Sequence, residues 1–189
     1  MTARITPDSS STATGERATL QAVAELVGRL LLKEVDAELL EQMADPKLAE
    51  VFNDMGVDFP TSANESSWLE ERGADYHDLF LRPETGPLVQ SLWTQGRYEG
   101  DSTVRVRQLA QTAGVEFQRA AARGAAPDHL GCLLLLWART DGRVQVVADE
   151  LTGAHLRWAE IPLQRIQTSG GFYGAVATLA LTLIVALDT

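Results

Sequence analysis

The sequence predicts an all-α protein, a single-domain helical bundle, and three observations lead to this prediction. Apolar residues recur at spacings of three and four along much of the chain, as they do on one face of an α-helix. Two segments, near 128–140 and 172–187, are apolar nearly all round, as the central helices of a bundle are. No internal repeat, heptad run or interdomain linker is present, and 189 residues are enough for one well-buried domain.

The N-terminal part begins with a polar segment and continues as closely spaced helices. Residues 1–15 are rich in Ser and Thr and are expected to form a disordered lead-in, which places the helical domain at 16–189. The first helix is expected at 16–35, where the apolar residues form one stripe. Asp36 can cap a short second helix, and Pro46 suits the first turn of a third.

The middle of the chain alternates helices with turn-forming residues. A helix is expected near 66–80 and ends before the break RPETGP, after which PLVQSLW has no clear conformation. Another helix is expected to begin at Asp101 or Ser102, either of which can cap it. Further helices are expected near 128–140, 143–151, 158–166 and 172–187. The glycines of GGFYG are expected to bend the chain at the start of the last helix rather than to hold a phosphate.

Composition and charge exclude several classes of protein. The net charge is −10, and nucleic-acid binding depends on clustered Lys and Arg, so no nucleic-acid partner is expected. Cys132 is the single cysteine and lies in an aliphatic run, which predicts a buried thiol and no internal disulfide. Three histidines without a cysteine pair give no zinc-binding pattern, so no metal is expected.

Two terminal segments bear on location. The N-terminus lacks the apolar core of a signal peptide. The apolar run 172–187 is shorter than the roughly 20 residues that span a bilayer, and this favours a buried helix over a tail anchor. A cytoplasmic protein without stable membrane insertion is therefore expected.

Motifs for catalysis and nucleotide binding are absent from the sequence. It contains no GxxxxGK[ST], GxSxG or HExxH motif, so neither catalytic residues nor a cofactor are expected. Asp128 and His129 open the aliphatic helix, but adjacent helical residues point about 100° apart and cannot readily act on each other. Asp128 is expected to be the N-cap, and the helix dipole is expected to keep His129 neutral. A small hydrolase that uses His129 or His77 as its base is kept as a minor alternative.

Three stretches, taken together, resemble the TorD/DmsD family of chaperones for redox enzymes. These stretches are DYHDLFLRPETGPLVQSLW, YEGDSTVRVRQLAQTAGVEF and PDHLGCLLLLWARTDGR, and the resemblance extends from about Trp68 to the C-terminus. In the first stretch the matching positions are Tyr76, Leu79, Phe80, Pro87, Ser91 and Trp93. Ala125 and Ala126 replace the acidic residue and the proline that many members carry, and Pro127 directly precedes Asp128. This Pro-Asp-His variant is nearer to the NarJ branch, which serves nitrate reductases.

The resemblance implies a cytoplasmic chaperone rather than an enzyme. Its partner would be the twin-arginine signal peptide, or the apoprotein, of a molybdenum-cofactor oxidoreductase, and binding would delay export until the cofactor is inserted. We expect the peptide to be bound by Trp68, Tyr76, Phe80, Pro87, Ser91, Trp93, Asp128 and His129. The chain would be a monomer, or a dimer that exchanges helices through loops such as RPETGP or TDGR.

A twin-arginine leader has a basic head beside an apolar stretch, and its receptor needs an acidic rim beside an apolar groove. Carboxylates surround the aromatic residues of the helix near 66–80, and the candidates for such a rim are Glu65, Glu70, Glu71, Asp75 and Asp78. The same pattern also suits an ordinary solvated helix face. A structural adaptor that binds a folded subunit without any leader is the second alternative.

Overall fold

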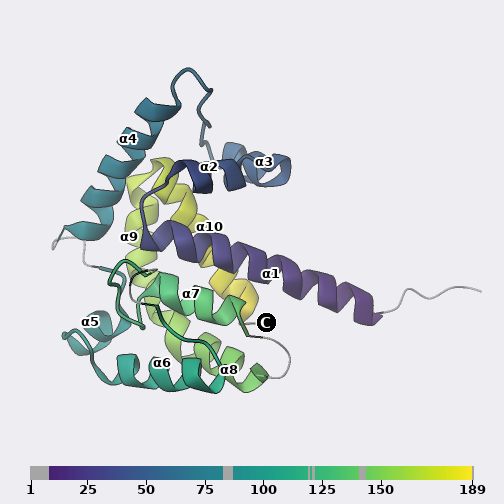
Figure 1. Cartoon of the computed structure of the whole chain (residues 1–189), viewed down its shortest axis with the longest axis vertical. Coiled ribbons are helices and arrows are strands. Elements are labelled where there is room, and N and C mark those ends of the chain that lie inside the picture. The colour runs from purple at the N-terminus through teal and green to yellow at the C-terminus, as the bar shows by residue number, and fades with distance from the viewer. Residues whose placement is uncertain (1–8, 83–86, 119, 121, 141–143, 189) are drawn as a thin grey trace, which may run out of the picture.

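The computed structural model describes residues 9–82, 87–118, 120, 122–140 and 144–188 (Figure 1). Within these ranges the chain forms a single all-α domain without strands. The α-helices are α1 (Ser9–Leu32), α2 (Ala37–Met43), α3 (Pro46–Asp54), α4 (Glu65–Tyr76), α5 (Gln90–Gln95), α6 (Asp101–Thr112), α7 (Leu130–Ala138), α8 (Gln145–Glu150), α9 (Glu160–Ser169) and α10 (Gly171–Leu187). Two π-helical segments, η1 (His77–Leu81) and η3 (Leu151–Leu156), and a 3-10 turn, η4 (Arg157–Ala159), continue α4 and α8.

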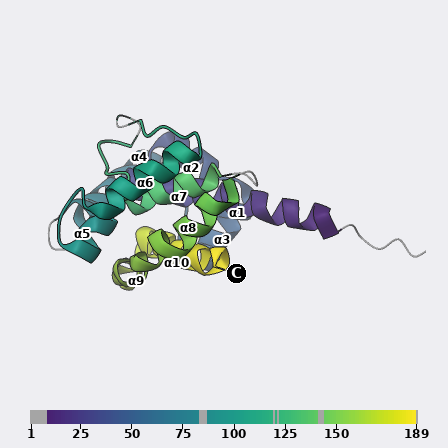
Figure 2. The ribbon, with the colours of Figure 1, turned by 90° about the horizontal axis from the view of Figure 1, so that it is seen from below.

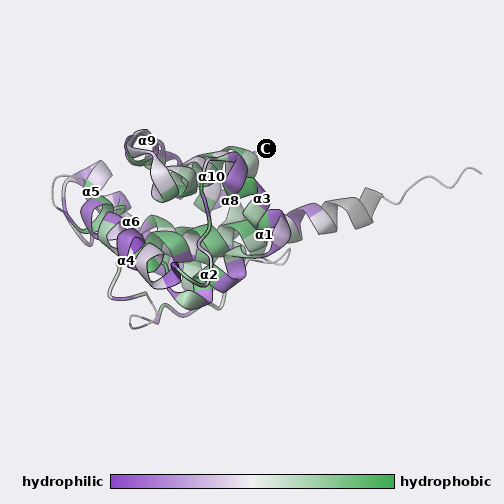
Figure 3. Ribbon diagram, turned by 90° about the horizontal axis from the view of Figure 1, so that it is seen from above, coloured by the Kyte–Doolittle hydropathy of each residue, from purple (hydrophilic) through white to green (hydrophobic). Residues whose placement is uncertain are grey.

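The helices pack around two pairs. Helix α1 packs along α7, and α10 packs along α9, while α10 also contacts α1. Figure 2 shows α9 and α10 together on one side of α1 and α7, with the N-terminal end of α1 projecting from the body. Hydrophobic residues colour the interior of the bundle in Figure 3, whereas polar residues mark much of α4 and α6.

The two helices that the sequence predicted to be central are indeed buried. In α7 every residue from Leu130 to Leu134 is buried, and so are Leu136 and Trp137. In α10 the residues from Phe172 to Ala177 are buried, whereas Val185 near its end is exposed. Cys132 is 2% exposed, which confirms the prediction of a buried thiol, and burial raises the pKa of that thiol to about 12.

Glycines set the distance between α1 and α7. A Cβ atom on Gly28 would lie 2.9 Å from the carbonyl oxygen of Gly131, and one on Gly131 would lie 2.6 Å from that of Gly28. Side chains there would force the helices apart, since such contacts are closer than carbon and oxygen atoms allow. The pair therefore fixes how closely the start of α7 approaches α1.

Several local predictions are confirmed. The Asp36 carboxylate caps α2 by accepting from the Leu39 amide at 3.0 Å, and Pro46 is the first residue of α3. Gly170 and Gly171 have φ of 71° and 63°, which explains why the bend before α10 needs glycine.

Other boundaries differ from the prediction. Helix α1 begins at Ser9, inside the segment expected to be a disordered lead-in, because extending an existing helix costs little per residue. The helices expected near 66–80 and 143–151 are α-helical at first and then widen into η1 and η3, which sequence periodicity does not reveal. Helix α6 has Gly100 at its N-cap, so neither Asp101 nor Ser102 caps it as expected.

Some expectations concern residues outside the described ranges. Residues 1–8 of the lead-in, 83–86 of the RPETGP loop and 141–143 of the TDGR loop belong to this group. Of the helices that the structure describes, none has the length and apolarity needed to cross a membrane.

Replacing Gly28 with alanine is expected to lower the free energy of unfolding by about 1–3 kcal/mol, because the new methyl group would overlap the Gly131 carbonyl. The matched control is Gly15→Ala on the same helix, where nothing lies within 4 Å of the added carbon. It is expected to stabilise the protein by up to about 1 kcal/mol, since alanine favours helix. Urea unfolding measures both values, and equal effects of the two substitutions would contradict the close helix crossing.

Candidate functional site

A buried carboxylate, that of Asp128, joins three segments that are far apart in the chain. Its Oδ2 accepts from the backbone N–H of Ser91 at 2.8 Å and from the Ser102 hydroxyl at 3.0 Å. Its Oδ1 accepts from the Thr103 hydroxyl at 2.8 Å. Asp128 is 0% exposed, so these bonds replace water and hold the starts of α5 and α6 against the residue before α7.

The backbone reinforces the same junction. Val89 and His129 form an antiparallel β-bridge, in which Gln90 N–H donates to the Asp128 carbonyl at 3.0 Å and Leu130 N–H donates to the Leu88 carbonyl at 2.8 Å. The short segment PLVQSLW is thereby fixed against the start of α7. Its conformation was unclear from sequence because its partner lies some forty residues away.

The hydrogen bonds keep Asp128 ionised. Burial raises the pKa of its carboxyl, but the bonds from Ser91, Thr103 and Ser102 outweigh this effect and place the pKa below its ordinary value. A buried carboxylate with several donors is charged at neutral pH and needs no cationic partner.

The prediction that Asp128 caps the aliphatic helix is wrong, because His129 occupies that position. His129 is the N-cap of α7, and its Nδ1 accepts from the Gly131 amide at 3.1 Å. Asp128 instead accepts from the N–H of Ser91, the second residue of α5. It thereby replaces the side-chain cap that α5 lacks, because the N-cap residue of α5 is Val89, which has no polar side chain. Sequence alone did not distinguish the two possible caps, because the strand-like pairing with Val89 turns Asp128 towards α5.

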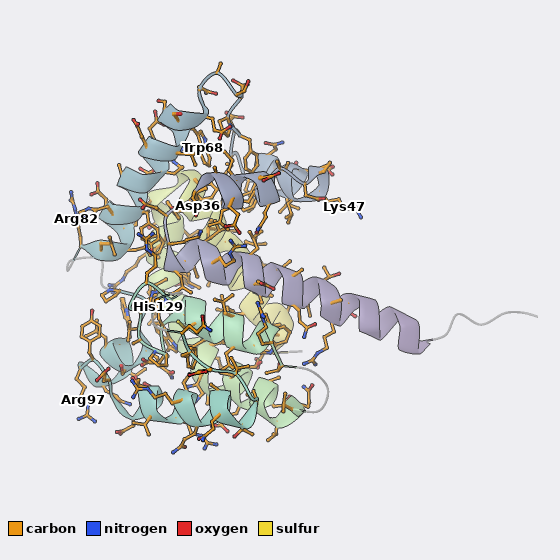
Figure 4. All side chains as sticks on the ribbon, in the orientation of Figure 1. Asp36, Lys47, Trp68, Arg82, Arg97 and His129 are labelled. Carbon is orange, nitrogen blue, oxygen red and sulfur yellow. The ribbon has the colours of Figure 1, made fainter. Side chains whose placement is uncertain are left out.

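His129 is a neutral imidazole with a defined tautomer. Burial lowers its pKa to about 4, although the nearby Asp128 acts in the opposite direction. Because Nδ1 accepts a hydrogen bond, the ring proton is on Nε2, which is left to donate. A base with so low a pKa is weak, which argues against the hydrolase alternative for this residue. Figure 4 shows His129 at the N-terminal end of α7.

A cavity of about 560 Å³ lies beside His129, and we call it the His129 cavity. Its volume is in the range of ordinary ligand sites. The walls come from α4 and η1 on one side, from the segments before α5 and α6 on another, and from the loop before α7. Its walls include Tyr76, Phe80, Leu81, Pro87, Val89, Tyr98, Phe117 and His129.

The local structure explains how the aromatic residues reach the cavity. Tyr76 is the last residue of α4, and its hydroxyl donates to the Leu31 carbonyl at 3.2 Å. The π-helical turn η1 then places Phe80 against Tyr76, with ring centroids 4.8 Å apart, and leaves Leu81 61% exposed. Such single π turns inside helices are frequent at functional sites.

Two strained residues face the same cavity. Glu99 and Arg123 have φ of 52° and 50°, and they are the non-glycine residues with positive φ in the described ranges. Both line the His129 cavity, and such a conformation costs on the order of 1 kcal/mol or more. Backbone strain of this kind clusters at ligand-binding and switch regions of proteins.

The cavity brings together some of the residues predicted from sequence. Tyr76, Phe80, Pro87 and His129 line it. Ser91 and Asp128 lie behind its wall, and the Trp93 indole supports it by donating to the Pro87 carbonyl at 2.9 Å.

Trp68 lies apart from this cavity. Its ring packs 5.4 Å from that of Phe172, and its indole N–H donates to the Asp58 carbonyl at 3.1 Å. Figure 4 shows Trp68 and His129 well separated. Phe117 and Tyr98, which do line the cavity, were missed from sequence, although the alternation of VEFQ was a signal for the first.

The charges at the His129 cavity do not form the expected acidic rim. The charged residues in its lining are Glu99, Arg107 and Arg123. Arg107 pairs with Glu99 at 3.6 Å and Arg123 with Glu34 at 3.7 Å. The carboxylates expected to form the rim, Glu65, Glu70, Glu71, Asp75 and Asp78, do not line this cavity.

Metal binding has no support in the described part of the chain, where no group of three or more His, Cys, Asp or Glu side chains is arranged to hold an ion. The candidate site consists of a mostly apolar cavity, a hydrogen-bond donor on the neutral imidazole of His129, and a wall held by the buried carboxylate of Asp128.

Comparison with known proteins gives one match. A family model described as nitrate reductase delta subunit matches residues 33–149, more than half of the chain. The match includes most residues of the His129 cavity and its wall. Neither the curated proteins nor the solved structures gave a match.

Replacing His129 with asparagine is expected to reduce the amount by which the free energy of unfolding falls between pH 6.5 and pH 4. The unfolded histidine has a pKa near 6.5 and the folded one about 4, so the unfolded state binds more protons between these values. Stability is therefore fully present above pH 6.5 and falls towards pH 4, by on the order of 3 kcal/mol. Asparagine can still accept from Gly131 but does not titrate.

The measurement is the free energy of unfolding from pH 7.5 to about pH 4 for both proteins. Exposed His77→Asn is the control, because it removes a histidine without touching the wall. Parallel curves for the wild type and His129→Asn would show that His129 is not buried in its neutral form.

Proposed function

Because the chain belongs to the nitrate reductase delta subunit family, whose members are chaperones for molybdoenzyme maturation, we propose that it binds an apolar segment of its client's catalytic subunit in the His129 cavity. The observation that carries the proposal is the cavity itself, whose apolar walls surround a neutral histidine with a free N–H donor. An apolar peptide segment needs contacts of this kind, together with a donor for its backbone carbonyls.

Exposed apolar residues at the same place support this assignment. Leu81 is 61% exposed and Tyr98 is 57% exposed, and both belong to the cavity lining. Large apolar side chains that remain in water next to a cavity favour a partner that covers them. Each such side chain can contribute about 1 kcal/mol or more to binding when it is covered.

The proposed action is binding without chemical turnover. The chaperone would hold a client segment in the cytoplasm until the molybdenum cofactor is inserted, and would release it afterwards. No catalytic residue or cofactor is needed for this role, since its free energy comes from burial of apolar surface and from a few hydrogen bonds.

Two kinds of client segment fit the proposal, a twin-arginine signal peptide and a segment of the apoprotein. The mixed charges of Glu99, Arg107 and Arg123 offer no net attraction for a pair of arginines. The apolar stretch that follows the arginines, or an apolar segment of the apoprotein, therefore suits the His129 cavity better than the basic head does.

A structural adaptor is the second candidate function. It would bind a folded subunit through Leu81, Tyr98 and their surroundings without needing a leader. Deletion of the client's leader distinguishes these two functions. A leader-binding chaperone no longer binds the leaderless client, whereas an adaptor still binds it.

The double variant Leu81→Ala/Tyr98→Ala is expected to weaken binding of the client's catalytic subunit by roughly 5- to 30-fold, from about 1–2 kcal/mol of lost apolar contact. Both residues are exposed, so the fold should survive the change. Titration calorimetry with full-length and leaderless client measures the effect.

The matched control is Val146→Ala/Ile161→Ala, which removes two apolar side chains of similar exposure, 68% and 60%, on α8 and α9. It is expected to bind the client as the wild type does. Unchanged affinity in the Leu81/Tyr98 variant, or equal losses in both variants, would overturn the assignment of the client site.

A further inference from the structure

Acidic residues are concentrated in one part of the molecule. Residues 34–78 contain thirteen of the 26 Asp and Glu residues of the chain but only two of its 16 Lys and Arg residues, Lys47 and Arg72. This segment forms α2, α3 and α4, which lie together at one end of the structure (Figure 1). The negative charge of the protein is therefore unevenly distributed, and this end attracts cations most strongly.

A second cavity, of about 610 Å³, opens in this end between α2, α3 and the first residue of α4, and we call it the acidic groove. Its walls are mostly apolar and include Leu40, Phe59 and Pro60. Its charged lining residues are two carboxylates, Glu41 and Glu65, and no lysine or arginine lines it. The acidic groove thus combines apolar walls with charge of one sign only, whereas the charged residues that line the His129 cavity have both signs.

The two carboxylates are available to a partner. Among the residues that the structure describes, neither Glu41 nor Glu65 has an ion-pair partner, although nearby carboxylates do. Glu38 pairs with Arg29 at 2.7 Å, and Asp75 pairs with Arg72 at 2.9 Å. Arg29 and Arg72 are thus engaged by other carboxylates, and no described ion pair compensates the charge of Glu41 or Glu65.

We propose that the acidic groove binds a basic segment of a protein partner, with an apolar side chain against Leu40 and Phe59 and a lysine or arginine beside Glu41 and Glu65. Apolar contact supplies most of the affinity, because exposed ion pairs contribute about 0–1 kcal/mol each. The carboxylates select a cationic segment and speed its association, and they repel an acidic one.

This surface is separate from the proposed client site. The acidic groove and the His129 cavity share no lining residue, and they lie at opposite ends of α4. The twelve residues of α4 separate them by roughly 16 Å along the helix axis. Both surfaces can therefore be occupied at the same time, and each can be tested without the other.

The test uses a short fluorescein-labelled peptide with two arginines next to a leucine and a phenylalanine, and a matched peptide with glutamates in place of the arginines. Fluorescence anisotropy with the full-length protein is expected to show binding of the arginine peptide, weakened as salt rises from about 0.05 M to about 0.3 M. The glutamate peptide is expected not to bind. In the Glu41→Gln/Glu65→Gln variant, affinity for the arginine peptide is expected to fall roughly 5- to 20-fold.

The matched control is Glu116→Gln/Glu160→Gln, which removes the same charge from exposed carboxylates elsewhere on the surface and should leave affinity unchanged. Equal weakening by both double variants would overturn the proposal, since net charge alone would then explain binding. Equal binding of the two peptides, or loss of the arginine peptide in Leu81→Ala/Tyr98→Ala, would also overturn it. The result for the acidic groove does not depend on the proposed client site, because the Glu41→Gln/Glu65→Gln variant leaves the His129 cavity intact.

Discussion

The carboxylate of Asp128 is the interaction on which the candidate site depends. Removed from water, it accepts hydrogen bonds from residues of α5 and α6 while its own backbone begins the turn into α7. Burying a charge costs much free energy unless the charge is fully hydrogen-bonded. Movement of α5 or α6 away from Asp128 would break these hydrogen bonds and therefore destabilise the protein strongly. The carboxylate thus converts three separate segments into one rigid wall.

That wall also needs a fixed distance to α1, which the two glycines Gly28 and Gly131 provide. Gly131 has a second role, because its amide donates to His129 and so sets the tautomer of the ring. The packing of the core and the chemistry of the cavity are therefore linked through one residue. The strained backbone at Glu99 and Arg123 is tolerated because the surrounding structure holds it in place.

Sequence predicted the fold class well, because helix periodicity and caps such as Asp36 are local properties. It placed Asp128 and His129 at the start of the buried helix but assigned the cap to the wrong one, since the deciding contact with Val89 is long-range. The sequence also predicted that Trp68 and Tyr76 belong to the same peptide-binding site, because both lie on one helix. Eight residues of helix separate them, about 12 Å along the axis and about 80° around it, and the two side chains therefore join different clusters. Likewise, the nearness of carboxylates in sequence could not reveal that the acidic groove is formed by α2 and α3.

Amide hydrogen exchange of the Asp128→Asn variant tests the central role of this carboxylate most directly. Asparagine keeps the shape of the side chain, but it has one acceptor oxygen in place of two and no charge, so it cannot accept all three hydrogen bonds from Ser91, Ser102 and Thr103. Exchange is expected to accelerate in residues 88–95 and at the starts of α6 and α7, while α9 and α10 keep their protection. Unchanged protection in 88–95, or the same acceleration throughout the molecule, would contradict the claim that Asp128 holds the wall together.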